Sequence, residues 1–84
     1  MNKQDKKIIT DMIIASLQAF KKSDYMQAFN GYKQAVKHYN ELCNESHRND
    51  FTTLLKNTCK CQGVAFNAYN IEMFKEHKKA VAYV

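Results

Sequence analysis

The stretch SDYMQAFNGYKQAVKHY, residues 23–39, carries the pattern that decides the fold. Here and just beyond, a tyrosine or an apolar residue recurs at steps of 3, 4, 3, 4 and 3 residues. Such steps place the recurring residues on one continuous stripe along a helix. Alanines that alternate with flat aromatic rings indicate that a second helix packs closely against this stripe. The stripe consists of Tyr25, Ala28, Tyr32, Ala35, Tyr39 and Leu42, with Phe29, Val36 and Cys43 as a parallel row.

The stripe predicts a helix over residues 24–45, preceded by a first helix over residues 5–22. Ser23 and Asp24 offer an N-cap between the two helices, and Asp24 followed by Gln27 resembles a capping box. The first helix has a wide apolar face, which is typical of a helix that contacts two neighbours. This face is formed by Ile9, Ile13, Leu17 and Phe20, with Ile8, Met12, Ala15 and Ala19 beside them.

A polar segment, NESHRND at residues 44–50, predicts a linker to a third helix, with Asn49 or Asp50 as its cap. Beyond the linker the same 3-4 stepping returns and predicts a helix over residues 50–79. Gly63 is either a tolerated glycine inside this helix or a break that yields four helices. Because the stepping continues through Gly63, we expect one continuous helix. The stepping residues are Phe51, Leu54, Thr58, Cys61, Ala65 and Ala68, with Leu55, Cys59, Phe66 and Tyr69 or Met73 as a second row.

These helices predict an all-α, antiparallel three-helix bundle that forms a single domain over residues 1–84. A length of 84 residues suits one small domain, and the lack of proline together with only two glycines argues against a turn-rich β fold. No apolar run is long enough to span a membrane, and the N-terminus does not read as a signal peptide. We therefore expect a cytoplasmic protein, either a monomer or a homodimer.

Three cysteines, Cys43, Cys59 and Cys61, leave one thiol unpaired however they combine. On a continuous helix Cys59 and Cys61 diverge by about 200°, so they cannot easily bridge each other or join one metal site. We expect reduced thiols and no zinc bound by Cys43, His47 and the later cysteines. The chain also shows no phosphate-binding glycine loop and no nucleophile elbow, so the sequence predicts neither an enzyme nor a cofactor.

A net charge of +5 predicts attraction to an acidic partner, which includes peptides, nucleic acids and anionic membrane surfaces. Lysines at the N-terminus and along the third predicted helix could bind nucleic acid weakly through counterion release. Arginine, the main reader of base edges, occurs only at Arg48, and no helix-turn-helix spacing is evident. Nucleic-acid binding is therefore the less favoured alternative to binding a protein or peptide.

The segment Asp24-Tyr25-x-x-Ala28-x-x-x-Tyr32-x-x-Ala35 resembles two families of helical interaction proteins. The tetratricopeptide repeat has a similar ladder, but at its period of about 34 residues Ala28 would be followed by Gln62, and no second ladder is present. The MIT (microtubule interacting and trafficking) domain, a three-helix bundle, is similar over nearly the whole chain. The similarity covers the first helix, the KKSDY turn, the ladder with Val36 and Tyr39, and Leu54, Cys59, Cys61 and Ala65 in the third helix. The departures are Val64-Ala65-Phe66, where the family has Arg-Ala-Glu, and Phe20, where an acidic residue is common.

The resemblance to MIT domains implies a non-enzymatic adaptor that binds a helical or acidic peptide in a groove between two helices. Its partners would be tails of ESCRT-type membrane-remodelling proteins or acidic tubulin tails. The groove would lie between the third helix and a neighbour, lined by Tyr39, Leu55, Cys59, Gln62, Phe66 and Tyr69, with Lys56 and Lys60 at its rim.

The alternative is a stand-alone phage, plasmid or bacterial inhibitor or immunity protein that neutralises one specific macromolecule. MIT domains normally lie within longer proteins, so a natural end at Val84 would favour this alternative.

Overall fold

A computed structural model describes residues 3–42 and 48–82 of the chain. Over these residues the structure is all-helical, without a β-strand, and the all-α prediction is confirmed. The prediction of three helices is wrong, because the third predicted helix is divided into two. The helices are α1 (Lys3–Lys21), α2 (Tyr25–Leu42), α3 (Arg48–Cys61) and α4 (Phe66–Ala82).

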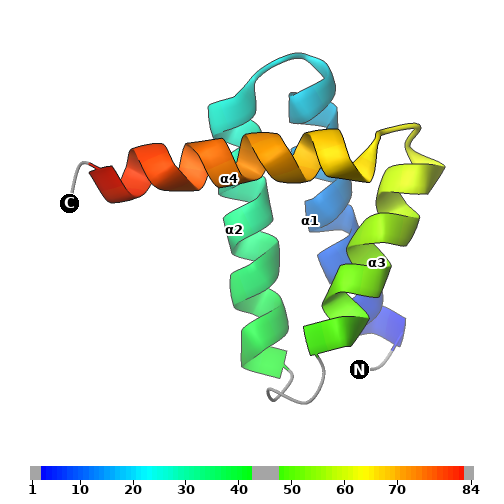
Figure 1. The fold of residues 1–84 in the computed structure, drawn as a ribbon. Coiled ribbons are helices and arrows are strands. Elements are labelled where there is room, and N and C mark those ends of the chain that lie inside the picture. The colour runs from blue at the N-terminus through cyan, green and yellow to red at the C-terminus, as the bar shows by residue number, and fades with distance from the viewer. Residues whose placement is uncertain (1–2, 43–47, 83–84) are drawn as a thin grey trace.

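The helices lie in two layers (Figure 1). Helices α1 and α2 form an antiparallel hairpin, α3 runs beside α1, and α4 crosses the hairpin at a steep angle. The molecule measures 34 × 31 × 18 Å, and its smallest dimension corresponds to two helices, each about 10 Å across. Only the first three helices therefore have the predicted up-and-down arrangement, and α4 forms a separate layer above them.

The contact between α1 and α2 is close because Gly31 lies where the two helices meet at Ser16. A Cβ atom placed at Gly31 would be 3.1 Å from Ser16 Cβ and 3.3 Å from Ser16 Cα. The buried Ser16 hydroxyl donates a hydrogen bond to the carbonyl oxygen of Ala28, and the Tyr69 hydroxyl lies 2.6 Å from Ser16 Oγ. Since the serine has a single proton, Tyr69 is the donor of the second bond. Ser16 thus connects α1 to both α2 and α4.

The predicted stripe on α2 contributes directly to the core. Ala28 and Ala35 are fully buried and Tyr39 nearly so, whereas Leu42 at the helix end is exposed. The apolar face predicted for α1 is confirmed at Ile9, Ile13 and Leu17, all fully buried. The rest of the core is formed by Phe29 of α2, by Phe51, Leu54, Leu55 and Cys59 of α3, and by Val64, Tyr69 and Met73.

The chain turns at Gly63 in a Schellman motif, which is why the predicted third helix is two helices. The amide of Val64 donates to Cys59 O at 2.9 Å, and the amide of Gly63 donates to Lys60 O at 3.2 Å. Gly63 has a φ of 69°, in the left-handed region that glycine adopts without steric cost. After the turn the 3-4 stepping no longer predicts burial, because Ala65 and Ala68 are exposed while the second row, Tyr69 and Met73, is buried.

The same motif ends α1. The amide of Asp24 donates to Ala19 O and the amide of Ser23 donates to Phe20 O, and Ser23 has a φ of 63°. Asp24 then caps α2, because its Oδ1 accepts a hydrogen bond from the Gln27 amide at 3.3 Å, as the sequence predicted.

Two other predicted helix boundaries concern the start of α3 and the end of α2. Helix α3 begins at Arg48, before both residues predicted to cap it. Residues 43–45, which were predicted to extend α2, lie outside the described residues.

Candidate functional site

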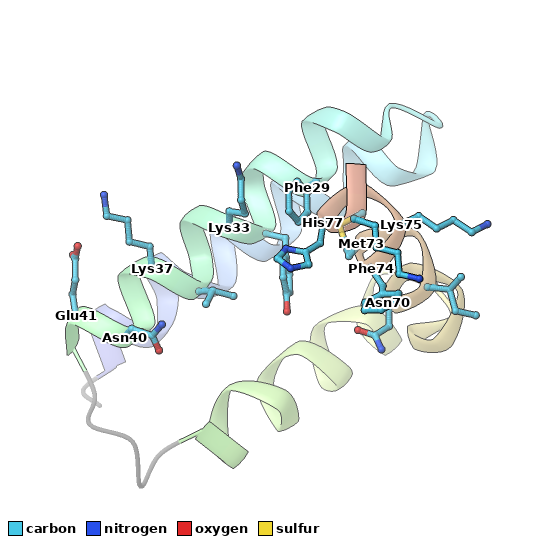
Figure 2. A pocket seen from close by; sticks show the side chains of 14 residues that line it. Phe29, Lys33, Lys37, Asn40, Glu41, Asn70, Met73, Phe74, Lys75 and His77 are labelled. Atoms are coloured by element: carbon cyan, nitrogen blue, oxygen red, sulfur yellow. The ribbon is translucent and has the colours of Figure 1, made fainter. Parts of the chain in front are cut away.

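An open groove of about 1050 Å³ lies in the angle where α4 crosses α2 (Figure 2). Successive turns of α2 form one wall of the groove, and the middle of α4 forms the other wall. The residues from α2 are Phe29, Tyr32, Lys33, Val36, Lys37, Asn40 and Glu41, and those from α4 are Asn70, Ile71, Met73, Phe74, Lys75, His77 and Lys78.

The floor of the groove is apolar, and part of it faces solvent. On α4, Phe74 is 59% exposed and Ile71 is 55% exposed, although both are large apolar side chains. Met73 and the half-buried Val36 join them from the edge of the core. Exposed apolar side chains that lie together in a concave surface are typical of sites that bind another molecule.

The rim of the groove is strongly positive. Lys33 and Lys37 rise from the α2 side and Lys75 extends from the α4 side (Figure 2). Lys78 is the fourth lysine, and Glu41 is the only carboxylate among the lining residues. Low-dielectric walls strengthen the field of such a rim, so the groove attracts negative charge.

Two of these lysines lie against aromatic rings inside the groove. Lys33 Nζ is 5.0 Å from the centroid of the Phe29 ring, and Lys78 Nζ is 4.8 Å from the centroid of the Phe74 ring. His77 approaches Phe29 from α4, with 6.3 Å between the ring centroids. The distances of both lysines are those of cation–π contacts.

Four of the residues predicted from sequence to line a groove are in the core. Tyr39, Leu55, Cys59 and Tyr69 are all at most 4% exposed. The Tyr39 ring packs 5.2 Å from Phe51, measured between centroids. These side chains hold the helices together and do not line the groove between α2 and α4.

The other four predicted residues lie at the surface near the turn between α3 and α4. Lys56 and Lys60 are exposed, and Gln62 and Phe66 are half-buried. The structure brings together Lys56 and Phe66, with Lys56 Nζ 5.4 Å from the ring centroid. None of the eight lines the α2–α4 groove, and their role in binding stays a prediction.

The prediction of one helix over residues 50–79 with one buried face gave no reason to expect the α4 side of the groove. Ile71, Phe74 and Val81 all lie outside both predicted rows, and all three are exposed. Large apolar residues at helical spacing that belong to no buried row were the available signal for this surface.

Burial also changes the acid–base properties of the core. It raises the pKa of the Cys59 thiol and the pKa values of Tyr32 and Tyr69 above their ordinary ranges. Cys59 and Cys61 are both free thiols, the first buried and the second exposed.

Within residues 3–42 and 48–82, no three His, Cys, Asp or Glu side chains are grouped to hold a metal ion. Cys43 and His47, which the sequence offered as zinc ligands, lie outside the described residues. No helix in the same residues is long and apolar enough to cross a membrane.

Comparison with known proteins finds no matching family model, no similar curated protein and no similar solved structure. The resemblance to MIT domains and to tetratricopeptide repeats therefore stays a prediction from the sequence. The site itself offers apolar contact inside a positive rim.

Proposed function

We propose that this chain is a protein-interaction domain that binds an acidic, helical segment of a partner protein in the α2–α4 groove. The observation that carries the proposal is the pair of exposed apolar side chains, Ile71 and Phe74, inside a rim of four lysines. An amphipathic helix with carboxylates beside its apolar stripe complements both features.

The dimensions of the groove suit a short helix. From Phe29 to Glu41 the α2 wall extends over about 18 Å, which is the length of roughly three helical turns. A partner helix of about a dozen residues laid along α2 would place its apolar stripe against Phe74 of α4.

Charge supports an acidic partner over a second copy of this chain. Two copies facing each other through this groove would oppose lysines with lysines, which is unfavourable. The apolar floor supports a protein over a nucleic acid, because phosphate contacts need lysines but no exposed Ile71 or Phe74.

The same class of function follows from the MIT resemblance, at a different pair of helices. Tails of ESCRT-type proteins and acidic tubulin tails are the partners which that resemblance implies.

The test compares two charge reversals that change the net charge equally. The probe is a synthetic helical peptide of about a dozen residues with a leucine and phenylalanine stripe flanked by glutamates. We expect micromolar binding to the wild type and at least a tenfold loss in Lys33→Glu/Lys37→Glu, which is about 1.4 kcal/mol. The matched control Lys56→Glu/Lys60→Glu alters the rim predicted from sequence and should have a smaller effect. A larger loss of peptide affinity in this control would indicate that the binding site lies at the α3–α4 turn, and it would contradict the proposal that the peptide binds in the α2–α4 groove.

Titration at two salt concentrations separates the partner classes. Peptide affinity should weaken moderately with salt, because apolar contacts persist after the charges are screened. A DNA oligonucleotide that binds more tightly than the peptide, with a steep salt dependence, would replace this proposal with nucleic-acid binding. Failure of both probes to bind would favour the inhibitor or immunity-protein alternative.

A further inference from the structure

We infer that Lys33 and Lys78 cover the aromatic floor of the groove and withdraw only when carboxylates of the partner bind them. This inference rests on the proposed function and adds a requirement for which partner segments the groove accepts. In this arrangement the acidic residues of a partner open the apolar surface that its own apolar residues then occupy.

The two covers are built in the same way on opposite walls. Lys33 follows Phe29 by four residues on α2, and Lys78 follows Phe74 by four residues on α4. A spacing of four places each lysine one helical turn beyond its ring on the same face. The ammonium-to-centroid distances, 5.0 and 4.8 Å, are nearly equal.

Phe29 is the more enclosed of the two rings. It lines the groove and is only 7% exposed because it packs in the hydrophobic core, and Lys33 also lies over its ring with His77 beside it. Phe74 remains more open, and Lys78 covers one part of its ring.

Carboxylates compete well for these lysines. A charge-assisted bond between an ammonium and a carboxylate is stronger than the attraction of an exposed ammonium to an aromatic ring. The flexible four-carbon stem of lysine lets the ammonium swing from the ring toward the rim. A neutral apolar peptide would have to displace both ammonium groups without replacing the contacts that they lose.

The groove also contains a matched pair of lysines that cover no ring. Lys37 on α2 and Lys75 on α4 line the same groove. The cation–π contacts among the described residues involve Lys33, Lys56 and Lys78, and neither Lys37 nor Lys75. Lys75 is instead 3.5 Å from the Glu72 carboxylate. Removing this pair changes the charge by the same amount without uncovering Phe29 or Phe74.

The experiment measures two peptides against two double variants. The peptides are the glutamate-flanked helix described above and its analogue with every glutamate replaced by glutamine. The variants are Lys33→Ala/Lys78→Ala and Lys37→Ala/Lys75→Ala, with unfolding midpoints measured for both. Since these positions lie on helix surfaces and alanine favours helix, we expect both variants to fold.

We expect the glutamine peptide to bind Lys33→Ala/Lys78→Ala more tightly than the wild type, by at least about fourfold, or roughly twofold for each lysine. Lys37→Ala/Lys75→Ala should show no such gain, and both variants should bind the glutamate peptide more weakly than the wild type. If the two variants bind the glutamine peptide with equal affinity, the lysines act only by attracting negative charge. This result would overturn the inference that Lys33 and Lys78 cover the rings, and the proposed function would stand. If the wild type fails to bind the glutamate peptide, the proposed function itself falls, and the inference falls with it.

Discussion

Ser16 and Gly31 determine how closely α1 and α2 approach, and so they set the position of the α2 wall. The Ser16 hydroxyl bonds both Ala28 O and the Tyr69 hydroxyl, so a shift of α1 would disturb three helices. Buried polar groups that are fully bonded in this way favour one arrangement of the helices over others.

We predict that Gly31→Ala lowers the free energy of unfolding by about 1 kcal/mol. Alanine favours the helix by roughly 1 kcal/mol, but its Cβ would meet Ser16 at 3.1 Å, and the backbone of α1 cannot yield without stretching the bonds of Ser16. Urea unfolding gives the measurement. The exposed neighbour Asn30→Ala serves as the control and should be neutral or slightly stabilising, and a net gain in Gly31→Ala would contradict the close contact.

We predict that stability falls as pH rises above about 10, partly because of Tyr69. Burial raises the pKa of Tyr69 above that of an unfolded tyrosine, about 10. Below that pH the phenol is protonated in both states and has no effect on the pH dependence of stability. Above it the unfolded chain loses a proton that the folded chain keeps, which favours unfolding.

Urea unfolding at about pH 8 and about pH 11 measures this loss. Tyr69→Phe should start less stable, because the bond to Ser16 is gone, and should lose less stability between the two values. An identical loss in the variant and the wild type would exclude Tyr69 as the cause.

At the scale of the elements, α1 and α3 end in the same Schellman motif with different residues at the left-handed position. Gly63 has this position after α3, and Ser23 has it after α1, with φ values of 69° and 63°. The left-handed region costs a residue with a Cβ about 1–2 kcal/mol, and glycine avoids most of this cost.

We predict opposite effects for reciprocal substitutions at these two turns. Ser23→Gly should stabilise the protein by about 1 kcal/mol, and Gly63→Ser should destabilise it by a similar amount. The Ser23 side chain is exposed, and no atom lies within 4 Å of a Cβ built at Gly63, so packing adds little to either effect. Thermal unfolding followed by circular dichroism would show shifts of opposite sign, and shifts of the same sign would contradict this account.

At the scale of the whole molecule, α4 is fixed to the other helices mainly by its first half. Tyr69 and Met73 are buried, whereas every residue from His77 to Ala82 is exposed. Helices α1 and α2 make the most extensive contact in the described structure. Stability should therefore differ between the hairpin and the end of α4.

We predict that amide hydrogen exchange is slowest in the middle of α1 and α2 and fastest in α4 beyond His77. Exchange followed by mass spectrometry of overlapping peptides resolves these segments. Equal protection of the two regions would mean that the end of α4 is covered by a contact with another molecule, such as a second copy. Dilution would then distinguish self-association, because protection by a second copy falls with concentration.

The sequence alone determined the helical class, the α1–α2 hairpin and most of its buried residues. Those features depend on local causes: a 3-4 stripe specifies one face of a helix, and Asp24 caps the helix that follows it. The close approach at Gly31 was also foreseeable, since a glycine inside a helix otherwise lowers stability.

Only the tertiary structure decided that the chain turns at Gly63 and that α4 crosses the hairpin. The 3-4 spacing of apolar residues continues unchanged through Gly63, and a glycine at this position is compatible with both a helix and a turn. The turn prevails in a structure where Val64, Tyr69 and Met73 become buried. The same crossing makes Phe74 and Ile71 line one groove with the lysines of α2, although these residues are far apart in sequence. The groove is formed by two segments that are distant in the sequence, so its shape depends on the angle at which they cross. The spacing of apolar residues within either segment carries no information about that angle.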